Sequence, residues 1–230
     1  MKSATQPLRI PARRAKAPPL RDAERTREQI LGAAAKEFAD SGLGGARVDR
    51  IAAQADVNVR MLYYYFSSKD DLFLAVLERA YQVIGEAEKG LELDQAEPME
   101  GVRRLVEFTW RFQLSHPEFI RLLNSENLHQ GRHLARSAAI AQLRSPLLEM
   151  IGRLLERGGN AGVFRRDVDP MRFYIMIASL SCFYLSNRYT LSAIFGRNLM
   201  APRQRAAHLA FMIEVVLGYL RPGAAESEAC

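Results

Sequence analysis

The stretch that decides the fold is residues 26–81, TREQILGAAAKEFADSGLGGARVDRIAAQADVNVRMLYYYFSSKDDLFLAVLERAY. Its apolar residues recur at three- and four-residue spacing, which is typical of amphipathic helices and not of alternating strands. On a first helix, expected over about 21–41, they form one stripe: Ile30, Leu31, Ala34, Ala35 and Phe38. Gly42 follows this stripe as a stop signal, so the segment begins with a well-bounded helix.

Two short helices are expected next, over about 46–55 and 59–66, with a tight turn between them. Asn58 is a good N-cap for the second of these, because its side-chain oxygen can accept a hydrogen bond from the first helical turn. Ser68 is placed to cap a longer helix that continues to about Lys89, with Asp71 in a capping-box-like position. Two short helices joined by a tight turn indicate a helix-turn-helix, whose second helix lies in the major groove of DNA.

The second short helix carries three consecutive tyrosines. Leu62 and Phe66 define its inner face, so its outward side is expected to present Arg60, Met61, Tyr64 and Tyr65, with Tyr63 close by. Tyrosine hydroxyls can bond phosphate oxygens, and their rings can pack on sugars or thymine methyl groups. Lys69, in the first turn of the next helix, adds an ammonium beside free amide groups that suit a phosphate. The alternative, strongest for Tyr63, is an aromatic cluster that packs this helix on its neighbours.

The same stretch resembles the DNA-binding domain of TetR-family transcriptional regulators. The family pattern appears here as Phe38 with Gly42, Ile51-Ala52, Ala55-Asp56-Val57, Leu62 to Phe66, and Ser68-Lys69 with Leu72. Asp56 stands where the family has a turn glycine, and Asn58 where it has Ser or Thr. The family's Thr contact to phosphate falls on Ala46 or Arg47, and Arg47 could replace it. The expected DNA-binding set is Arg47, Asn58, Arg60, Met61, Tyr63, Tyr64, Tyr65 and Lys69.

Helical spacing along most of the chain after residue 22, with hardly any strand signal, predicts an all-α protein of about nine helices. The resemblance implies a three-helix DNA-binding domain followed by a helical domain that binds a small molecule and dimerises. Such a homodimer represses by binding a palindrome in double-stranded DNA, with its two recognition helices ~34–36 Å apart. A small-molecule effector that prefers a splayed dimer would lower DNA affinity by linkage. The sequence does not identify the effector.

The charge of the 230-residue chain is concentrated at its start. The whole chain has a formal net charge of +6, and residues 1–29 hold eight bases against three acids. We therefore expect a basic disordered arm at 1–21, the DNA-binding domain at 22–67, the ligand-binding and dimerisation domain at 68–222, and a disordered tail at 223–230. The arm either contacts phosphate groups or serves only as a solubilising terminus.

The later helices are expected at about 99–115, 117–130, 134–158, 169–190 and 202–220, and Pro146 is expected to divide or kink the third. Pro117 and Pro202 suit first-turn positions. The last helix has an apolar seam that predicts a dimer contact: Leu209, Met212, Ile213, Val216 and Leu220. The alternative is an ordinary interior helix.

Polar and aromatic groups on otherwise apolar helices are the candidates for the ligand pocket: Trp110, Asn124, Asn127, His129, His133, Tyr174, Tyr184 and Asn187. Each could instead be a satisfied core residue. Glu126, His129 and His133 have a spacing that could hold a metal ion, but Gly131 interrupts the helix between the histidines. A capping or interhelix hydrogen bond is favoured, so neither a metal nor another cofactor is expected.

Other classes of protein are weaker matches. The sequence lacks GxSxG, HExxH and a Gly-rich phosphate loop, so an enzyme is not expected. Two cysteines without a CxxC pair indicate a reducing compartment, and the apolar run at 173–185 is too short to cross a bilayer, so a cytoplasmic protein with no membrane partner is expected. The remaining alternative is a helical small-molecule-binding or interaction protein without a specific operator.

Overall fold

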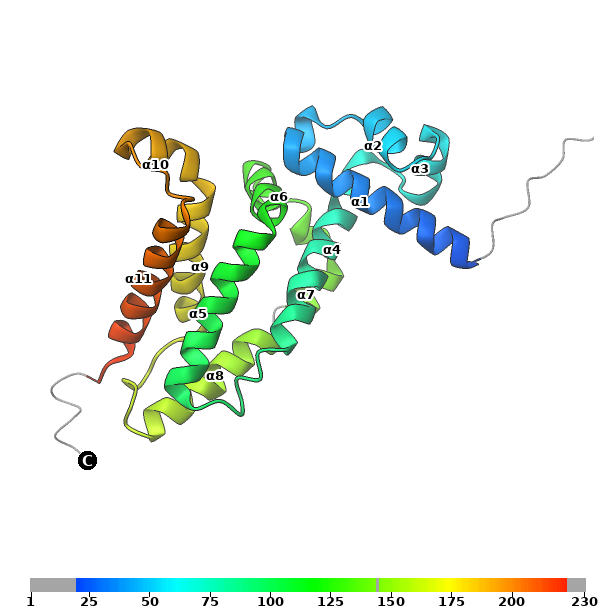
Figure 1. Cartoon of the computed structure of the whole chain (residues 1–230). Coiled ribbons are helices and arrows are strands. Elements are labelled where there is room, and N and C mark those ends of the chain that lie inside the picture. The colour runs from blue at the N-terminus through cyan, green and yellow to red at the C-terminus, as the bar shows by residue number, and fades with distance from the viewer. Residues whose placement is uncertain (1–19, 144, 223–230) are drawn as a thin grey trace, which may run out of the picture.

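The computed structural model describes residues 20–143 and 145–222. Figure 1 shows two groups of helices joined through α4 and α6. Within the described ranges the elements are α1 (Leu20–Gly45), α2 (Val48–Gln54), α3 (Val59–Tyr65), α4 (Lys69–Lys89), α5 (Pro98–Ser115), α6 (Pro117–Leu128), a 3-10 turn (Leu134–Arg136), α7 (Ala138–Leu143), α8 (Ser145–Asn160), α9 (Pro170–Ser186), α10 (Arg188–Phe195) and α11 (Pro202–Leu220). The all-helical prediction is confirmed for the described part of the chain.

The first group consists of α1, α2, α3 and the first half of α4, which share one apolar core. The predicted stripe of α1 supplies Ile30, Ala34 and Phe38, all fully buried. The Phe38 ring meets the Phe73 ring of α4 edge to face, with centroids 5.0 Å apart. The regular part of α1 ends at Gly42, whose φ of 65° and ψ of 171° interrupt the helix as the sequence predicts.

The turn between α2 and α3 forms as expected. Asp56 takes the left-handed conformation there, with φ of 54°, which Asp tolerates better than most residues. Asn58 caps α3, because its side chain accepts a 2.7 Å hydrogen bond from the backbone N–H of Met61. Ser68 caps α4 by accepting from the backbone N–H of Asp71 at 3.0 Å. Both predicted caps are confirmed, and they set the angle of α3.

The second group packs α5, α8, α9 and α11 around a separate core. Fully buried Leu105, Ile151 and Ile177 come from three of these helices. Gly158 lies against Phe164, and a Cβ atom there would sit 1.9 Å from the ring, so the close turn after α8 requires glycine. Pro117 and Pro202 occupy first-turn positions, which confirms that prediction.

The described residues form more helices than the nine expected. The 134–158 segment divides into the 3-10 turn, α7 and α8, and α8 begins at Ser145, next to Pro146 as predicted. The 169–190 helix was expected to be continuous, but it ends at Ser186, and Asn187 lies between α9 and α10. The Tyr184 hydroxyl donates to the Leu199 carbonyl at 2.8 Å, which holds the chain after α10 against α9.

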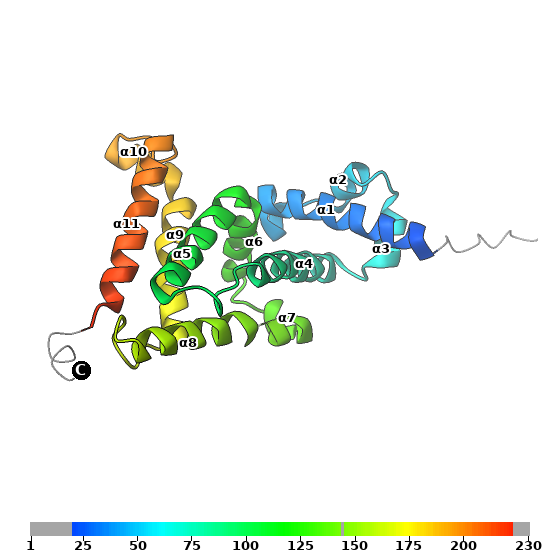
Figure 2. The ribbon, with the colours of Figure 1, turned by 60° about the horizontal axis from the view of Figure 1, so that its bottom comes forward.

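Helix α4 belongs to both groups, as Figure 2 shows. Leu72, Phe73 and Val76 lie in the first core, while the end of the helix runs alongside the second group. The expected domain boundary after residue 67 therefore separates α4 from the helices α1–α3, although the first half of α4 shares their core. The predicted arm and tail fall almost wholly on residues 1–19 and 223–230, outside the described ranges. Within those ranges, no helix combines the length and apolarity needed to cross a membrane.

Candidate DNA interface and ligand cavity

Helix α3 exposes part of the face that the sequence assigned to DNA. Tyr64 is 72% exposed and Tyr63 is 46% exposed. Arg60 is also exposed, and it forms no ion pair with any residue that the structure describes. Met61 is partly covered. A short helix that holds aromatic hydroxyls and an unpaired guanidinium in solvent can contact both phosphates and base edges.

Tyr65 departs from this outward set. It packs against the first core, and its hydroxyl is buried without a hydrogen-bond partner among the described residues. The reason is its position three residues after Leu62, which places it at the edge of the inner stripe formed by Leu62 and Phe66. Its ring meets the Tyr64 ring edge to face at 5.4 Å. Tyr65 therefore supports the ring of Tyr64 and presents no hydroxyl to the surface.

Three further residues of the expected set already form local bonds. The Arg47 guanidinium donates to both carboxylate oxygens of Asp49, at 3.1 and 2.7 Å, and this hydrogen bonding lowers the pKa of Asp49. The Asn58 side-chain oxygen is used by the α3 cap. Lys69 Nζ donates to the Ala46 carbonyl at 2.8 Å, which ties the start of α4 to the end of α1. These bonds orient α2 and α4 around α3.

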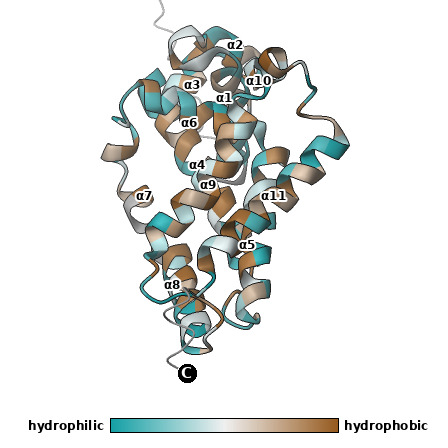
Figure 3. Cartoon of the chain, turned by 90° about the vertical axis from the view of Figure 1, so that its left-hand side faces the viewer, coloured by the Kyte–Doolittle hydropathy of each residue, from teal (hydrophilic) through white to brown (hydrophobic). Residues whose placement is uncertain are grey.

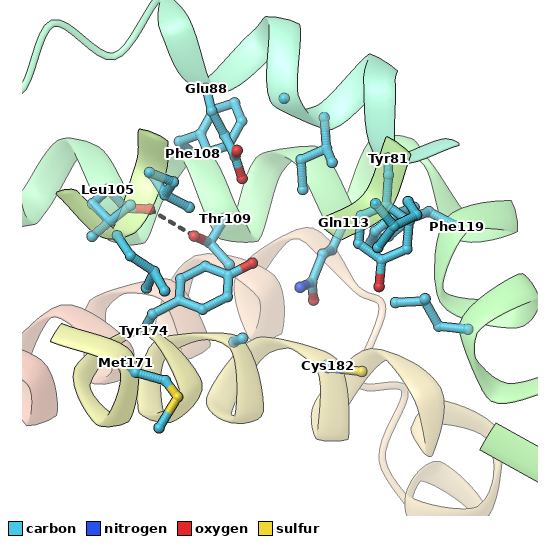
Figure 4. Close-up of a pocket in the computed structure, with 17 residues that line it drawn as sticks. Tyr81, Glu88, Leu105, Phe108, Thr109, Gln113, Phe119, Met171, Tyr174 and Cys182 are labelled. Carbon is cyan, nitrogen blue, oxygen red and sulfur yellow. Dashed lines mark hydrogen bonds between the residues drawn. The ribbon is translucent and has the colours of Figure 1, made fainter. Parts of the chain in front are cut away.

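A cavity of about 370 Å³ is lined by residues of α4, α5, α6, α7, α8 and α9 (Figure 4). Most of its lining is apolar and includes the rings of Phe108 and Phe119. The polar lining groups come from three helices: Tyr81, Glu88, Thr109, Gln113, Tyr174 and Cys182. This size and this mixture are typical of a small-molecule site.

Burial raises the pKa of three side chains in the cavity. Desolvation raises the pKa of Glu88 to about 7. Desolvation, and then the nearby Glu88 carboxyl, raise the pKa of Tyr174, and desolvation also raises that of Tyr81, so both phenols stay neutral. The Thr109 hydroxyl donates to the Leu105 carbonyl at 2.9 Å, whereas Gln113 Oε1 is buried without a partner. The cavity therefore holds unused hydrogen-bond acceptors.

Of the eight expected ligand residues, the structure places Tyr174 in this cavity. Trp110 is instead 3% exposed and packs edge to face on Tyr184, 5.7 Å between centroids. The Asn124 side chain donates to the Ser186 hydroxyl at 3.0 Å, and the Asn187 side chain donates to the Phe183 carbonyl. Asn127 is exposed. Trp110, Tyr184, Asn124 and Asn187 thus contact residues of their own chain. The alternative of a core residue holds for Trp110, whereas Asn124 is exposed.

Glu126 and His133 form a buried pair, 2% and 1% exposed. His133 Nδ1 donates to Glu126 Oε2 at 2.6 Å, and the backbone N–H groups of His133 and Leu134 donate to Oε1. His129 donates separately to the Ser125 carbonyl at 2.7 Å. The favoured hydrogen-bond role is confirmed. Neither histidine lines the cavity, which corrects the ligand assignment. Within the described residues, no three His, Cys, Asp or Glu side chains form a set that could hold a metal ion.

The predicted seam of α11 faces its own chain. Met212, Val216 and Leu220 are fully buried in the second core, and Leu209 and Ile213 pack against it. This corrects three of the five expected dimer residues, because no partner can reach Met212, Val216 or Leu220. Leu209 and Ile213 are half-buried. The spacing of the apolar residues on α11 indicates a packing face, but it does not show whether this face packs on the same chain or on a second copy. The exposed apolar side chains of α9 and α11 are different ones: Ile175, Phe183, Phe211 and Tyr219. Figure 3 shows hydrophobic residues along these two helices.

The cavity residues that the sequence analysis missed had a signal. Tyr81 and Glu88 lie seven residues apart on α4, with Ile84 between them on the same side. Thr109 and Gln113 continue the stripe of Leu105 on α5 at four-residue spacing. Polar residues on an apolar stripe mark a cavity or a buried bond. Distinguishing the two needs the packing of the neighbouring helices.

The fold and this pair of sites match one family of regulators. Residues 30–76 match the family model described as bacterial regulatory proteins, tetR family, and residues 98–216 match that of the tetracyclin repressor-like C-terminal domain. Together the two matches cover more than half of the chain. The chain belongs to the TetR family of helix-turn-helix transcriptional regulators.

Individual relatives agree with this assignment. The chain is 42% identical over 199 residues to the HTH-type transcriptional repressor NicS of Pseudomonas putida, covering 86% of this chain and 94% of that protein. It is 27% identical to the HTH-type transcriptional regulator RutR of Escherichia coli O157:H7, covering 75% and 80%. The transcriptional regulator SCO4942 of Streptomyces coelicolor has a similar fold, with a TM-score of 0.61, 24% identity, and coverage of 85% and 98%.

Proposed function

We propose that this protein is a repressor that binds a palindromic operator as a homodimer and is released from it by a small-molecule effector. Such a protein acts in the cytoplasm, where the DNA is, and binds its effector without transforming it. The observation that carries the proposal is the exposed face of α3, which presents Arg60 and Tyr64 from the second helix of a helix-turn-helix. Membership of a family of regulators, and similarity to the repressor NicS, support it.

Within the operator, Arg60, Tyr63 and Tyr64 are the proposed base and phosphate contacts of α3. Arg47 adds a phosphate contact by exchanging its Asp49 partner for DNA, since both side chains are exposed. Lys69 keeps its hydrogen bond to the Ala46 carbonyl and donates its remaining N–H groups to a phosphate. Asn58 acts through the cap that holds the start of α3, and Tyr65 through the packing of Tyr64.

For the dimer, we propose the outer faces of α9 and α11. Phe183 is 64% exposed and Phe211 is 51% exposed, on two helices that pack side by side in the chain. Large aromatic groups with exposed apolar neighbours are typical anchors of a protein interface. A two-fold axis through this face would pair α9 and α11 with their copies in a four-helix arrangement.

Helices α4 and α6 are the proposed route from effector to operator. α4 contributes Phe73 to the first core and Glu88 to the cavity, while α6 contributes Phe119 to the cavity and packs on α1. The Leu43 N–H at the end of α1 donates to Ser125 Oγ of α6 at 3.2 Å. A ligand that spreads the cavity would displace both helices and move α3, which lowers DNA affinity by linkage.

A fluorescence anisotropy titration tests the proposal. The wild type should bind duplex DNA from the region upstream of its own gene with Kd of order 10⁻⁸–10⁻¹¹ M, and a scrambled duplex much more weakly. Arg60→Ala should reduce the difference between the duplexes. Arg166→Ala removes an exposed arginine of the α8–α9 loop and serves as the control. Equal affinity of the wild type for both duplexes at one salt concentration would favour the alternative, a small-molecule-binding or interaction protein without a specific operator.

A further inference from the structure

The cavity contains an acidic side chain without a basic counterpart. Glu88 lines it from α4, and none of the described lining residues is Lys, Arg or His. The backbone carbonyl of Glu88 accepts from the Leu91 N–H at 3.1 Å, but its side-chain carboxyl group forms no hydrogen bond or ion pair with any residue that the structure describes. Its neighbour Lys89 pairs instead with Glu86 at 2.6 Å, on the exposed side of the helix. A carboxyl group that faces an apolar cavity without a partner favours a ligand that brings a positive charge or a hydrogen-bond donor.

Gln113 is an independent second observation. The residue is 8% exposed, and its Oε1 atom is buried without a partner among the described residues. Figure 4 shows this amide pointing into the same space as the Tyr174 hydroxyl. Buried polar groups in folded proteins nearly always have a partner, so an unpartnered carbonyl in a cavity is a place for a donor on the ligand. Glu88 and the Gln113 Oε1 atom are both acceptors, and the donor that Gln113 adds, its amide NH₂ group, is uncharged.

We infer that the effector is an apolar, ring-containing molecule that carries a protonated amine, with its ammonium against Glu88 and an N–H group donating to Gln113 Oε1. The inference rests on the proposed function, because it takes this cavity to be the effector site. The rings of Phe108, Phe119 and Tyr174 supply the apolar contacts. Their faces also attract a nearby cation. A carboxylate ligand would meet Glu88 without any lining base to balance it, so anions are rejected.

Isothermal titration calorimetry with three ligands of one shape tests the inference on the full chain at pH 8. The probes are 1-naphthylmethylamine, 1-naphthalenemethanol and 1-naphthoate, which are cationic, neutral and anionic. The amine should bind most tightly and the naphthoate least. Glu88→Gln should weaken amine binding at least tenfold, and Gln113→Leu should weaken it less. Glu86→Gln, which removes an exposed acid of the same helix, should leave it unchanged.

The pH dependence gives a second readout. The titratable groups that share the cavity with Glu88 are Tyr81 on α4 and Tyr174 and Cys182 on α9. Burial raises the pKa of both tyrosines, so the two phenols stay neutral near pH 7. The residues lining it from α5, α6, α7 and α8 are uncharged. Because the pKa of Glu88 is raised to about 7, its ionised fraction rises steeply from pH 6 to pH 8. Amine affinity should therefore increase by about tenfold over this range in the wild type, and stay flat in Glu88→Gln.

Several outcomes would overturn the inference. These are the absence of amine binding at millimolar concentration, naphthoate binding as tightly as the amine, and equal amine affinity in Glu88→Gln and the wild type. Alcohol binding as tightly as the amine would show a donor requirement without the charge, which also contradicts it. The same preparations are titrated with the upstream duplex. If the preparations bind the duplex specifically but do not bind the amine, the inferred ligand class is wrong and the proposed function is unaffected. Loss of specific DNA binding would instead be a failure of the proposed function.

Discussion

The two helical groups of this protein use apolar residues in opposite ways. The group of α1–α3 buries nearly all of them and exposes, on α3, an arginine and two tyrosines. The group of α5 and α8–α11 leaves a cavity beside its core and keeps Phe183 and Phe211 in solvent. A unit that reads DNA needs one fixed shape with polar groups outside. A unit that takes up a ligand and a second copy needs unfilled apolar surface.

The largest expected effect lies at the junction of the groups. Glu126→Ala leaves two backbone N–H groups and His133 without their buried acceptor, so the free energy of unfolding should fall by about 3 kcal/mol. Urea denaturation measures this loss. Glu118→Gln changes a half-buried acid in the first turn of the same helix and should cost much less. Equal losses would show that the Glu126 pair does not join the two groups.

The exposed aromatic face of the second group is tested by Phe183→Asp. A charge in the centre of an apolar interface should cost at least about 2 kcal/mol of association free energy. Sedimentation at micromolar concentration should then show a monomer with weakened operator binding. Val83→Asp adds the same charge at an exposed position of α4, 44% exposed, and should stay dimeric. A dimeric Phe183→Asp protein would place the interface elsewhere.

The reading face of the first group is tested by Tyr64→Ala. If Tyr64 contacts a base, this change should lower operator affinity by about 1–3 kcal/mol and relax specificity at one position. Competition against operators with single base changes measures both effects. An equal loss on random DNA would assign Tyr64 to the phosphate backbone.

The cavity should make stability depend on pH. Because burial raises the folded-state pKa of Glu88 to about 7 from 4.5, the unfolded chain ionises first as the pH rises, and Glu88 lowers stability progressively between these values. Glu88→Gln should therefore match the wild type near pH 4.5 and exceed it at pH 8. With allowance for partial exposure, the excess should be about 1–2 kcal/mol. Chemical denaturation at both pH values measures it, and a constant difference would contradict the cause.

The smallest effect is expected for Tyr65→Phe. Its hydroxyl is buried without a partner, so removing it should leave operator affinity unchanged and stabilise the fold by up to about 1 kcal/mol. Thermal melts and anisotropy titrations check the two parts. A loss of affinity comparable with that of Tyr64→Ala would return Tyr65 to the DNA-contacting set.

Local chemistry explains what was predictable from the sequence. The Asn58 and Ser68 caps and the break at Gly42 each depend on a few adjacent residues, and all three were predicted. The helix-turn-helix followed from them. Asp56, which stands where the family has a turn glycine, takes a left-handed conformation. The location of the second group's helices was also largely predictable, because prolines begin many of them.

The features that could not be predicted from the sequence depend on which helix faces pack against each other in the folded chain. The spacing of Met212 and Val216 predicts a buried face, but only packing shows that α5 and α9 of the same chain cover it. Trp110 and Glu88 both stand on apolar stripes, yet one fills the core and the other faces a cavity. Tyr65 differs from Tyr64 by one position, and this moves its hydroxyl from solvent to the interior.

We propose above all that α3 reads DNA from each half of a dimer. A DNase I footprint on the upstream region, with wild type and Tyr64→Ala at the same salt concentration, tests this. We predict one protected palindrome whose half-sites are centred about 10 base pairs, or a multiple of one turn, apart, and its loss in the variant. Protection without two-fold symmetry, or the same protection by both proteins, would contradict the account.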